Sequence, residues 1–221
     1  MSIRSRDTIF IWFGGVVTDL ITEITMQSLR IEQNFNGSFR QRSEFKKLAD
    51  ELSLGLRSTH SYCDSVLKST DSSLDVNTLD EMIPSKASLN KPIMYLIDSI
   101  PDTFEKWLIS DYPESWFQEI TSRTDLSSHF PIDRTIFTSQ CDLKEMVPMV
   151  FSYIGRTSGH PLDECVLIDS ISSRAVKAVR CGLSSIVYVY PERLEHELAL
   201  RGILETEIEV LHPQTSRRVD I

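Results

Sequence analysis

The segment from Thr8 to Leu20, TIFIWFGGVVTDL, constrains the fold of this chain more than any other. Its apolar run at residues 9–11 is too short for a buried helix and is typical of a fully buried strand. The Gly14-Gly15 pair that follows permits a tight turn, which residues with a Cβ would resist. A buried strand that ends in a glycine turn indicates the first strand of an α/β domain, whose site lies beyond the carboxyl ends of the strands. Trp12 stands at that end of the strand.

The stretch Trp12-Phe13-Gly14-Gly15-Val16 resembles the first motif of the haloacid dehalogenase (HAD) superfamily. The similarity is to the subgroup whose first strand ends in Asp-Phe-Gly-Gly-Val. The resemblance implies that the nucleophilic aspartate of the family falls on Trp12. An indole can neither attack phosphorus or carbon nor ligate Mg²⁺, so the catalytic motif is degenerate at this position.

Composition and charge narrow the classes of function. The 221 residues suit one domain, or one domain with an inserted subdomain. A net charge of −9 argues against a nucleic-acid-binding surface. No apolar run reaches the length of about 18 residues that a membrane span needs, and the N-terminus lacks the apolar core of a signal peptide. The four scattered cysteines indicate free thiols in a reducing compartment, so we expect a cytoplasmic protein.

The region after the first strand has the apolar spacing of several helices, separated by polar breaks. In HAD proteins an insertion at this place forms a helical cap over the site, and the resemblance implies the same here. We therefore predict a cap at residues 21–87 and an α/β core at residues 1–20 and 88–221. The alternative is a plain helical subdomain with no ligand beneath it.

Further short apolar runs at residues 92–97, 135–138, 165–169 and 185–190 predict four more strands. Phe104, Trp107 and Leu108 are expected on a helix after the second strand, residues 192–204 on the last helix, and residues 207–211 on an optional edge strand. This alternation predicts a five-stranded parallel Rossmann-like sheet with helices on both faces and a small inserted helical cap.

The resemblance also assigns later motifs. A HAD second strand ends in Ser or Thr followed by Asn, and that hydroxyl binds the transferring phosphoryl group; Asp98-Ser99 falls there. Alternatively, Asp98 only caps the following turn. In the third motif, Glu145 stands where the family has a lysine, and Lys144 is adjacent.

The fourth predicted strand ends in the pair Asp169-Ser170. The resemblance implies that Asp169 keeps the first of two acids that hold Mg²⁺ in the family, while Ser170 replaces the second. The positions aligned with the family site are Trp12, Gly14, Asp98, Ser99, Glu145, Asp169 and Ser170.

These substitutions predict a HAD-like protein that has lost phosphohydrolase or dehalogenase activity and serves as a binding or regulatory module without a cofactor. Its partner would be an unidentified protein or a small metabolite, and exposed cap and edge surfaces would allow a homodimer.

Two hydrolase hypotheses remain open. Asp98 and Asp169 could share a divalent cation such as Mg²⁺ and activate water directly. Alternatively, the chain is a HAD hydrolase of a small phosphorylated metabolite whose nucleophile lies elsewhere, for instance at Asp7 or Asp19.

Overall fold

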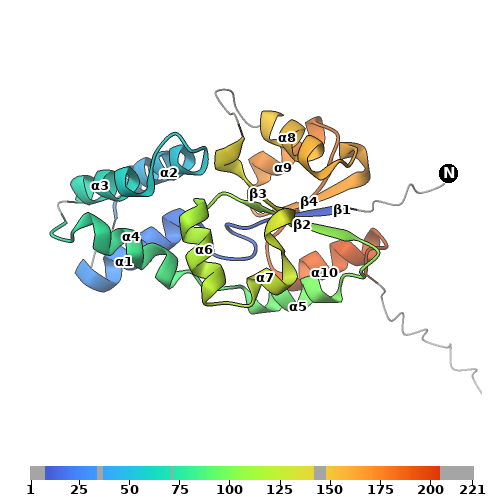
Figure 1. The fold of residues 1–221 in the computed structure, drawn as a ribbon, viewed down its shortest axis with the longest axis horizontal. Helices are drawn as coiled ribbons and strands as arrows, with labels where there is room; N and C mark the ends of the chain where they lie inside the picture. Colours follow the sequence, from blue (N-terminus) through green and yellow to red (C-terminus); the bar gives the residue numbers. More distant parts are fainter. Residues whose placement is uncertain (1–7, 34–36, 71, 142–147, 205–221) are drawn as a thin grey trace, which may run out of the picture.

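The computed structural model of the chain describes residues 8–33, 37–70, 72–141 and 148–204 (Figure 1). Within them, a sheet of five parallel strands has the order β3-β2-β1-β4-β5. The strands are β1 (Thr8–Trp12), β2 (Glu105–Ser110), β3 (Thr135–Phe137), β4 (Cys165–Asp169) and β5 (Ser184–Val187). This sheet confirms the predicted fold class.

The central position of β1 follows from its composition. All five of its residues are buried, and it pairs with β2 on one side and β4 on the other. A strand that is covered on both faces reads as a continuous apolar run in parallel sheets. The predicted first, third, fourth and fifth strands are confirmed within one to three residues.

The predicted second strand is wrong. Residues 92–97 belong to helix α5 (Lys91–Ser99), whose buried side chains are Ile93, Met94 and Ile97, while Tyr95 is exposed. This spacing buries one helix face, and Pro92 stands in the first turn, where a helix tolerates proline. The strand β2 instead takes residues 105–110, so Trp107 and Leu108 lie on a strand and not on the predicted helix.

Helices cover both faces of the sheet (Figure 1). On one face lie α8 (Pro148–Ser158) and α9 (Ser172–Arg180), and on the other lie α5 and α10 (Pro191–Leu200), which contact each other. The remaining core elements are α6 (Glu114–Ser122), α7 (Leu126–His129) and three 3₁₀ turns, η1 (Ile132–Arg134), η2 (Thr138–Gln140) and η3 (Leu162–Glu164). The expected edge strand at residues 207–211 lies outside the described residues.

Four helices are inserted between β1 and α5: α1 (Ile21–Gln33), α2 (Phe39–Ser53), α3 (Thr59–Thr70) and α4 (Val76–Lys86). They lie beyond the carboxyl end of β1 (Figure 1). Their mutual core contains Tyr62, whose hydroxyl lies 2.9 Å from Thr25 Oγ1. The division into a cap at residues 21–87 and a core stays a prediction, with which this arrangement agrees.

The chain leaves the sheet for the inserted helices and returns from them at one place. Asn90 N donates to Val17 O (2.8 Å), and Thr18 Oγ1 donates to Ser88 O (2.9 Å). Asn90 Nδ2 also donates to the hydroxyl of Tyr188, just after β5 (2.9 Å). These bonds hold both connections beside the carboxyl edge of the sheet.

No helix in the described part of the chain combines the length and the apolar character that crossing a membrane would require.

Candidate functional site

The glycine turn after β1 brings the chain against the end of β2. Trp12 closes β1 and is only 3% exposed. Two residues later, Gly14 N donates to Asp111 Oδ1 (3.0 Å). A Cβ at position 14 would lie 2.6 Å from the same oxygen, far inside van der Waals contact. Glycine is therefore required for the Asp111 carboxylate to approach this turn.

The second glycine connects the same turn to the end of β4. Gly15 has a φ of +85°, in the left-handed region that favours glycine, and a Cβ there would lie 2.2 Å from Ser170 Oγ. Ser170 Oγ is buried and makes no hydrogen bond to any residue that the structure describes. The predicted positions Trp12, Gly14, Asp169 and Ser170 thus lie together at one edge of the sheet.

Ser110 and Asp111 stand at the carboxyl end of β2, beside β1. They stand at the end of the second strand, where Asp98-Ser99 are predicted from the sequence. The Ser110 hydroxyl is fully buried, accepts from Tyr112 N and donates to Tyr112 O, both at 3.2 Å. The end of β2 therefore carries a buried hydroxyl, followed directly by the carboxylate of Asp111.

Asp98 and Ser99 lie elsewhere. Both are on α5, where Asp98 Oδ1 is 2.6 Å from His129 Nδ1 and Ser99 Oγ donates to Leu96 O. The Asp98 side chain is half-exposed and lines a different cavity, together with Arg123 and His129. Asp98 and Asp169 therefore do not come together, and the hypothesis of a cation shared by them is wrong.

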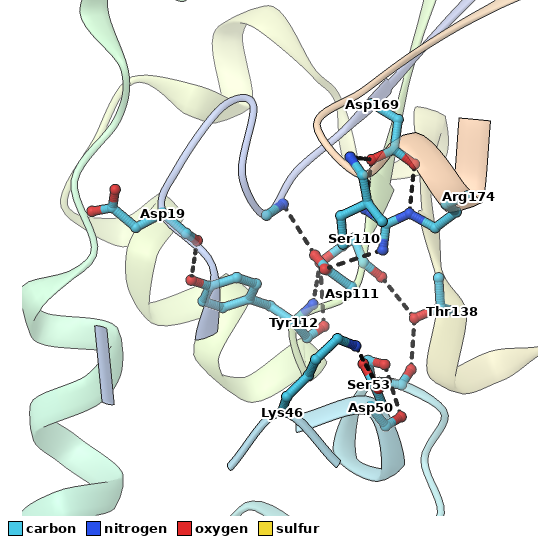
Figure 2. Close-up of polar contacts among 12 residues, drawn as sticks. Asp19, Lys46, Asp50, Ser53, Ser110, Asp111, Tyr112, Thr138, Asp169 and Arg174 are labelled. Atoms are coloured by element: carbon cyan, nitrogen blue, oxygen red, sulfur yellow. Dashed lines mark hydrogen bonds and ion pairs between the residues drawn. The ribbon is translucent and has the colours of Figure 1, made fainter. Parts of the chain in front are cut away.

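Arg174 binds the acid at the end of β4 from the first turn of α9 (Figure 2). Its Nε donates to Asp169 Oδ2 (2.5 Å) and its Nη2 donates to Asp169 Oδ1 (2.7 Å). Asp169 is fully buried, and Ile171 N also donates to Oδ1 (2.9 Å). Both carboxylate oxygens of Asp169 are thus satisfied by protein donors in a two-pronged pair, the strongest form of arginine–carboxylate contact.

The same guanidinium contacts Trp12 and Asp111. Arg174 Cζ lies 3.5 Å from the centroid of the Trp12 ring, in a cation–π arrangement. Arg174 Nη1 lies 3.9 Å from Asp111 Oδ2. Arg174 is not among the site residues predicted from the sequence. The signal that could have indicated it is an arginine in the first turn of the helix that follows the strand-end acid.

Asp111 is the carboxyl group whose ionisation this site perturbs. Burial raises the pKa of Asp111 above its ordinary value, since desolvation disfavours the charged form. The charge of Arg174 opposes this shift, and so, more weakly, do the N–H groups of Trp12 and Gly14. Trp12 Nε1 is buried and makes no hydrogen bond to any described residue, so its N–H acts on Asp111 only as a nearby dipole.

A cavity of about 380 Å³ lies between the inserted helices α1 and α2 and this edge of the sheet. It is lined by Leu20, Ile21, Thr22, Glu23, Met26, Arg30, Arg42, Phe45, Lys46, Ala49, Asp50, Ser53, Asp111, Ile171 and Arg174. Lys46 and Asp50 form an ion pair of 2.8 Å at its wall (Figure 2). The cavity therefore exposes the site acid Asp111 and the cation Arg174 to one small space.

The remaining predicted positions are placed as follows. Glu145 and Lys144 lie outside the described residues, and so does Asp7. Asp19 is exposed, and its backbone oxygen accepts from the hydroxyl of Tyr112 (2.7 Å).

A parallel sheet of this order, with helices inserted directly after its first strand, is the architecture expected of a HAD-like α/β protein. No family model matches the sequence, and no curated protein does. The solved structures do match, and at 12–15% identity they show that the chain has the HAD-like fold.

Three of these structures illustrate the similarity. A HAD family enzyme from Bacteroides thetaiotaomicron, in complex with magnesium and inorganic phosphate, matches 83% of this chain and 94% of its own with a TM-score of 0.64 and 14% identity. The L-2-haloacid dehalogenase from Xanthobacter autotrophicus, with chloropropionic acid covalently bound, covers 90% and 84% (TM-score 0.64, 12% identity). YfnB from Bacillus subtilis, bound to magnesium, covers 89% and 100% (TM-score 0.63, 15% identity).

At this sheet edge, the side chains that the structure describes do not form a donor set that fits the magnesium ion held by some of these proteins. Mg²⁺ takes oxygen ligands, which the indole of Trp12 lacks. Asp169 already uses both of its oxygens on Arg174 and Ile171. Among the described residues, no group of three or more His, Cys, Asp or Glu side chains is arranged to hold a metal ion.

Proposed function

We propose that this chain binds a small organic anion in the cavity between α1, α2 and the sheet edge, and does not perform the covalent chemistry of the HAD family. The observation that carries this proposal is Trp12, buried beneath Arg174 at the end of β1, where the family resemblance expects the nucleophile. Loss of a covalent nucleophile alone can cost about 10⁶ in kcat, judging from hydrolases.

The cavity wall supports a ligand that is part anion and part hydrocarbon. Among the described residues that line it, four are basic and three are acidic. Arg30, Arg42 and Lys46 come from the inserted helices, whereas Met26 and Phe45 supply apolar surface. A volume of about 380 Å³ lies in the range of roughly 300–1,000 Å³ typical of small-molecule sites.

The binding test uses two neighbouring lysines of α2. Lys46 lines the cavity, while Lys47 is absent from its lining and only approaches Glu51, at 3.9 Å. Carboxylate and phosphate metabolites are first screened for those that raise the melting temperature of the wild type. We expect these ligands to bind about tenfold more weakly to Lys46→Gln, because this variant loses one hydrogen bond from a charged group. Binding to Lys47→Gln should be unchanged. Equal weakening in both variants would contradict a ligand in this cavity.

A second candidate function is that of a HAD-type hydrolase acting on a small phosphorylated metabolite. The enzymes among the structural neighbours favour it, and so does Asp111. This carboxylate stands at the end of β2, the strand next to β1, and lines the cavity. A raised pKa suits a carboxyl group that acts as a general acid.

Hydrolysis of a generic aryl phosphate, with and without Mg²⁺, distinguishes the two functions. Asp111→Asn serves as the control, because the activity of a contaminating phosphatase would be the same in preparations of the wild type and of this variant. If the binding proposal is correct, the wild type shows no turnover above Asp111→Asn. Turnover that disappears in Asp111→Asn would instead establish the hydrolase.

A further inference from the structure

Arg174 bridges the acids at the ends of two strands. It holds Asp169 of β4 through two hydrogen bonds of 2.5 and 2.7 Å and approaches Asp111 after β2 at 3.9 Å (Figure 2). The Asp169 side chain is completely buried, and that of Asp111 is 12% exposed. The guanidinium is the cation that the structure places between these two carboxylates.

Two buried carboxylates beside each other need a positive charge. Removal of one partner from a buried ion pair leaves an uncompensated charge, which is strongly unfavourable. Carboxylate oxygens are the ligands that Mg²⁺ and Mn²⁺ prefer. The position between Asp169 and Asp111 would therefore attract a divalent ion if the guanidinium were absent.

The surroundings fix Arg174 in this position. The Trp12 ring lies against one face of the guanidinium. An arginine remains charged at every pH that a protein experiences, so its charge does not depend on the supply of metal ions. Trp12 is only 3% exposed, and its single polar side-chain group is an N–H that has no hydrogen-bond partner among the described residues. An N–H donor is no ligand for a metal ion.

We propose that the Arg174 guanidinium permanently occupies the place of a divalent cation, so that the wild-type protein binds none there, and that its removal opens a divalent-ion site formed by Asp169 and Asp111. This inference is independent of whether the cavity binds a metabolite, because it concerns the charge between the two strand ends.

The experiment is a titration of the full chain with Mn²⁺, in which electron paramagnetic resonance measures the concentration of the free ion. The wild type should show no saturable site. Arg174→Met should gain one saturable Mn²⁺ site, with at least about tenfold more bound ion than the wild type at the same free Mn²⁺ concentration, and Arg174→Met/Asp169→Asn should lose this gain. Arg201→Met is the matched control, since Arg201 pairs with a single carboxylate, that of Glu197, and its removal should create no site.

Three results would overturn the proposal. One is a saturable Mn²⁺ site in the wild type that Asp169→Asn weakens. Another is a folded Arg174→Met protein that binds no more Mn²⁺ than Arg201→Met does. If Arg174→Met folds only poorly, Mn²⁺ should restore its circular dichroism spectrum, and a failure to restore it would count equally against the proposal.

Discussion

At the scale of single residues, the site is defined by which strand ends carry a charged side chain. The end of β1 carries an indole, while the end of β2 carries the carboxylate of Asp111. Arg174 lies between that carboxylate and Asp169 and covers Trp12. The acid and the cation of this sheet edge, Asp111 and Arg174, therefore both lie outside the segment of residues 12–16.

The pH dependence of stability tests the environment of Asp111. Burial raises its pKa above the ordinary value of 3.8 in spite of Arg174. Between pH 3.8 and the higher folded-state pKa, the folded protein binds more protons at this carboxyl than the unfolded chain does. Its contribution to the free energy of unfolding therefore falls as the pH rises through that interval.

We expect the difference in unfolding free energy, wild type minus Asp111→Asn, to decrease with rising pH above 3.8 and then to level off. Urea titrations of both proteins at a series of pH values measure it. A difference that grows with pH would mean that the attraction of Arg174 outweighs burial and lowers the pKa.

At the scale of elements, α4 is attached to α6 through a buried indole. Trp116 Nε1 donates to Asp80 Oδ1 (2.6 Å), and the Trp116 ring packs edge-on against Tyr62 at 6.0 Å between centroids. These contacts join the inserted helices to the part of the chain that follows β2.

We expect Trp116→Phe to cost more free energy of unfolding than Trp107→Phe, by about 1.5–3 kcal/mol, the usual contribution of a hydrogen bond to a charged group. Trp107 is the matched control: it is also buried, but its Nε1 has no hydrogen-bond partner in the described part of the structure. Both changes remove the same atoms. Chemical denaturation measures both values, and equal costs would show that the Trp116–Asp80 bond contributes nothing.

At the scale of the whole molecule, the reactivity of the cysteine thiols measures how well the core excludes solvent. Cys63, Cys141 and Cys165 are buried, and all four cysteines are free thiols. Burial raises the pKa of Cys141 to about 11 and that of Cys165 to about 12, and it raises the pKa of Cys63 still further. Only Cys181 is partly exposed.

We expect a thiol reagent at neutral pH to modify Cys181 rapidly in the native protein and the other three thiols only after unfolding, because the thiolate is the reactive form. Mass spectrometry of the labelled protein, with and without denaturant, measures this. Rapid labelling of Cys63 in native conditions would indicate that the inserted helices open. The expected homodimer stays a prediction at this scale.

The amino-acid sequence by itself determined the α/β class, four of the five strands and the indole at the end of β1. These features are local: a buried strand needs only a short apolar run, and the residue at its end is read directly. The glycine turn was predictable for the same reason, because its positive φ at Gly15 is a property of the backbone.

Only the tertiary structure decided which groups meet at the site. The segments at residues 92–97 and 105–110 each contain only a short apolar run, and period alone does not distinguish a buried strand from a half-buried helix. Pairing with β1 and β3 selected the second run, and this placed Asp111 rather than Asp98 at the edge. Gly14 and Asp111 are 97 residues apart, so no local pattern could bring them together. Long-range packing therefore fixed the acid and the cation of this site.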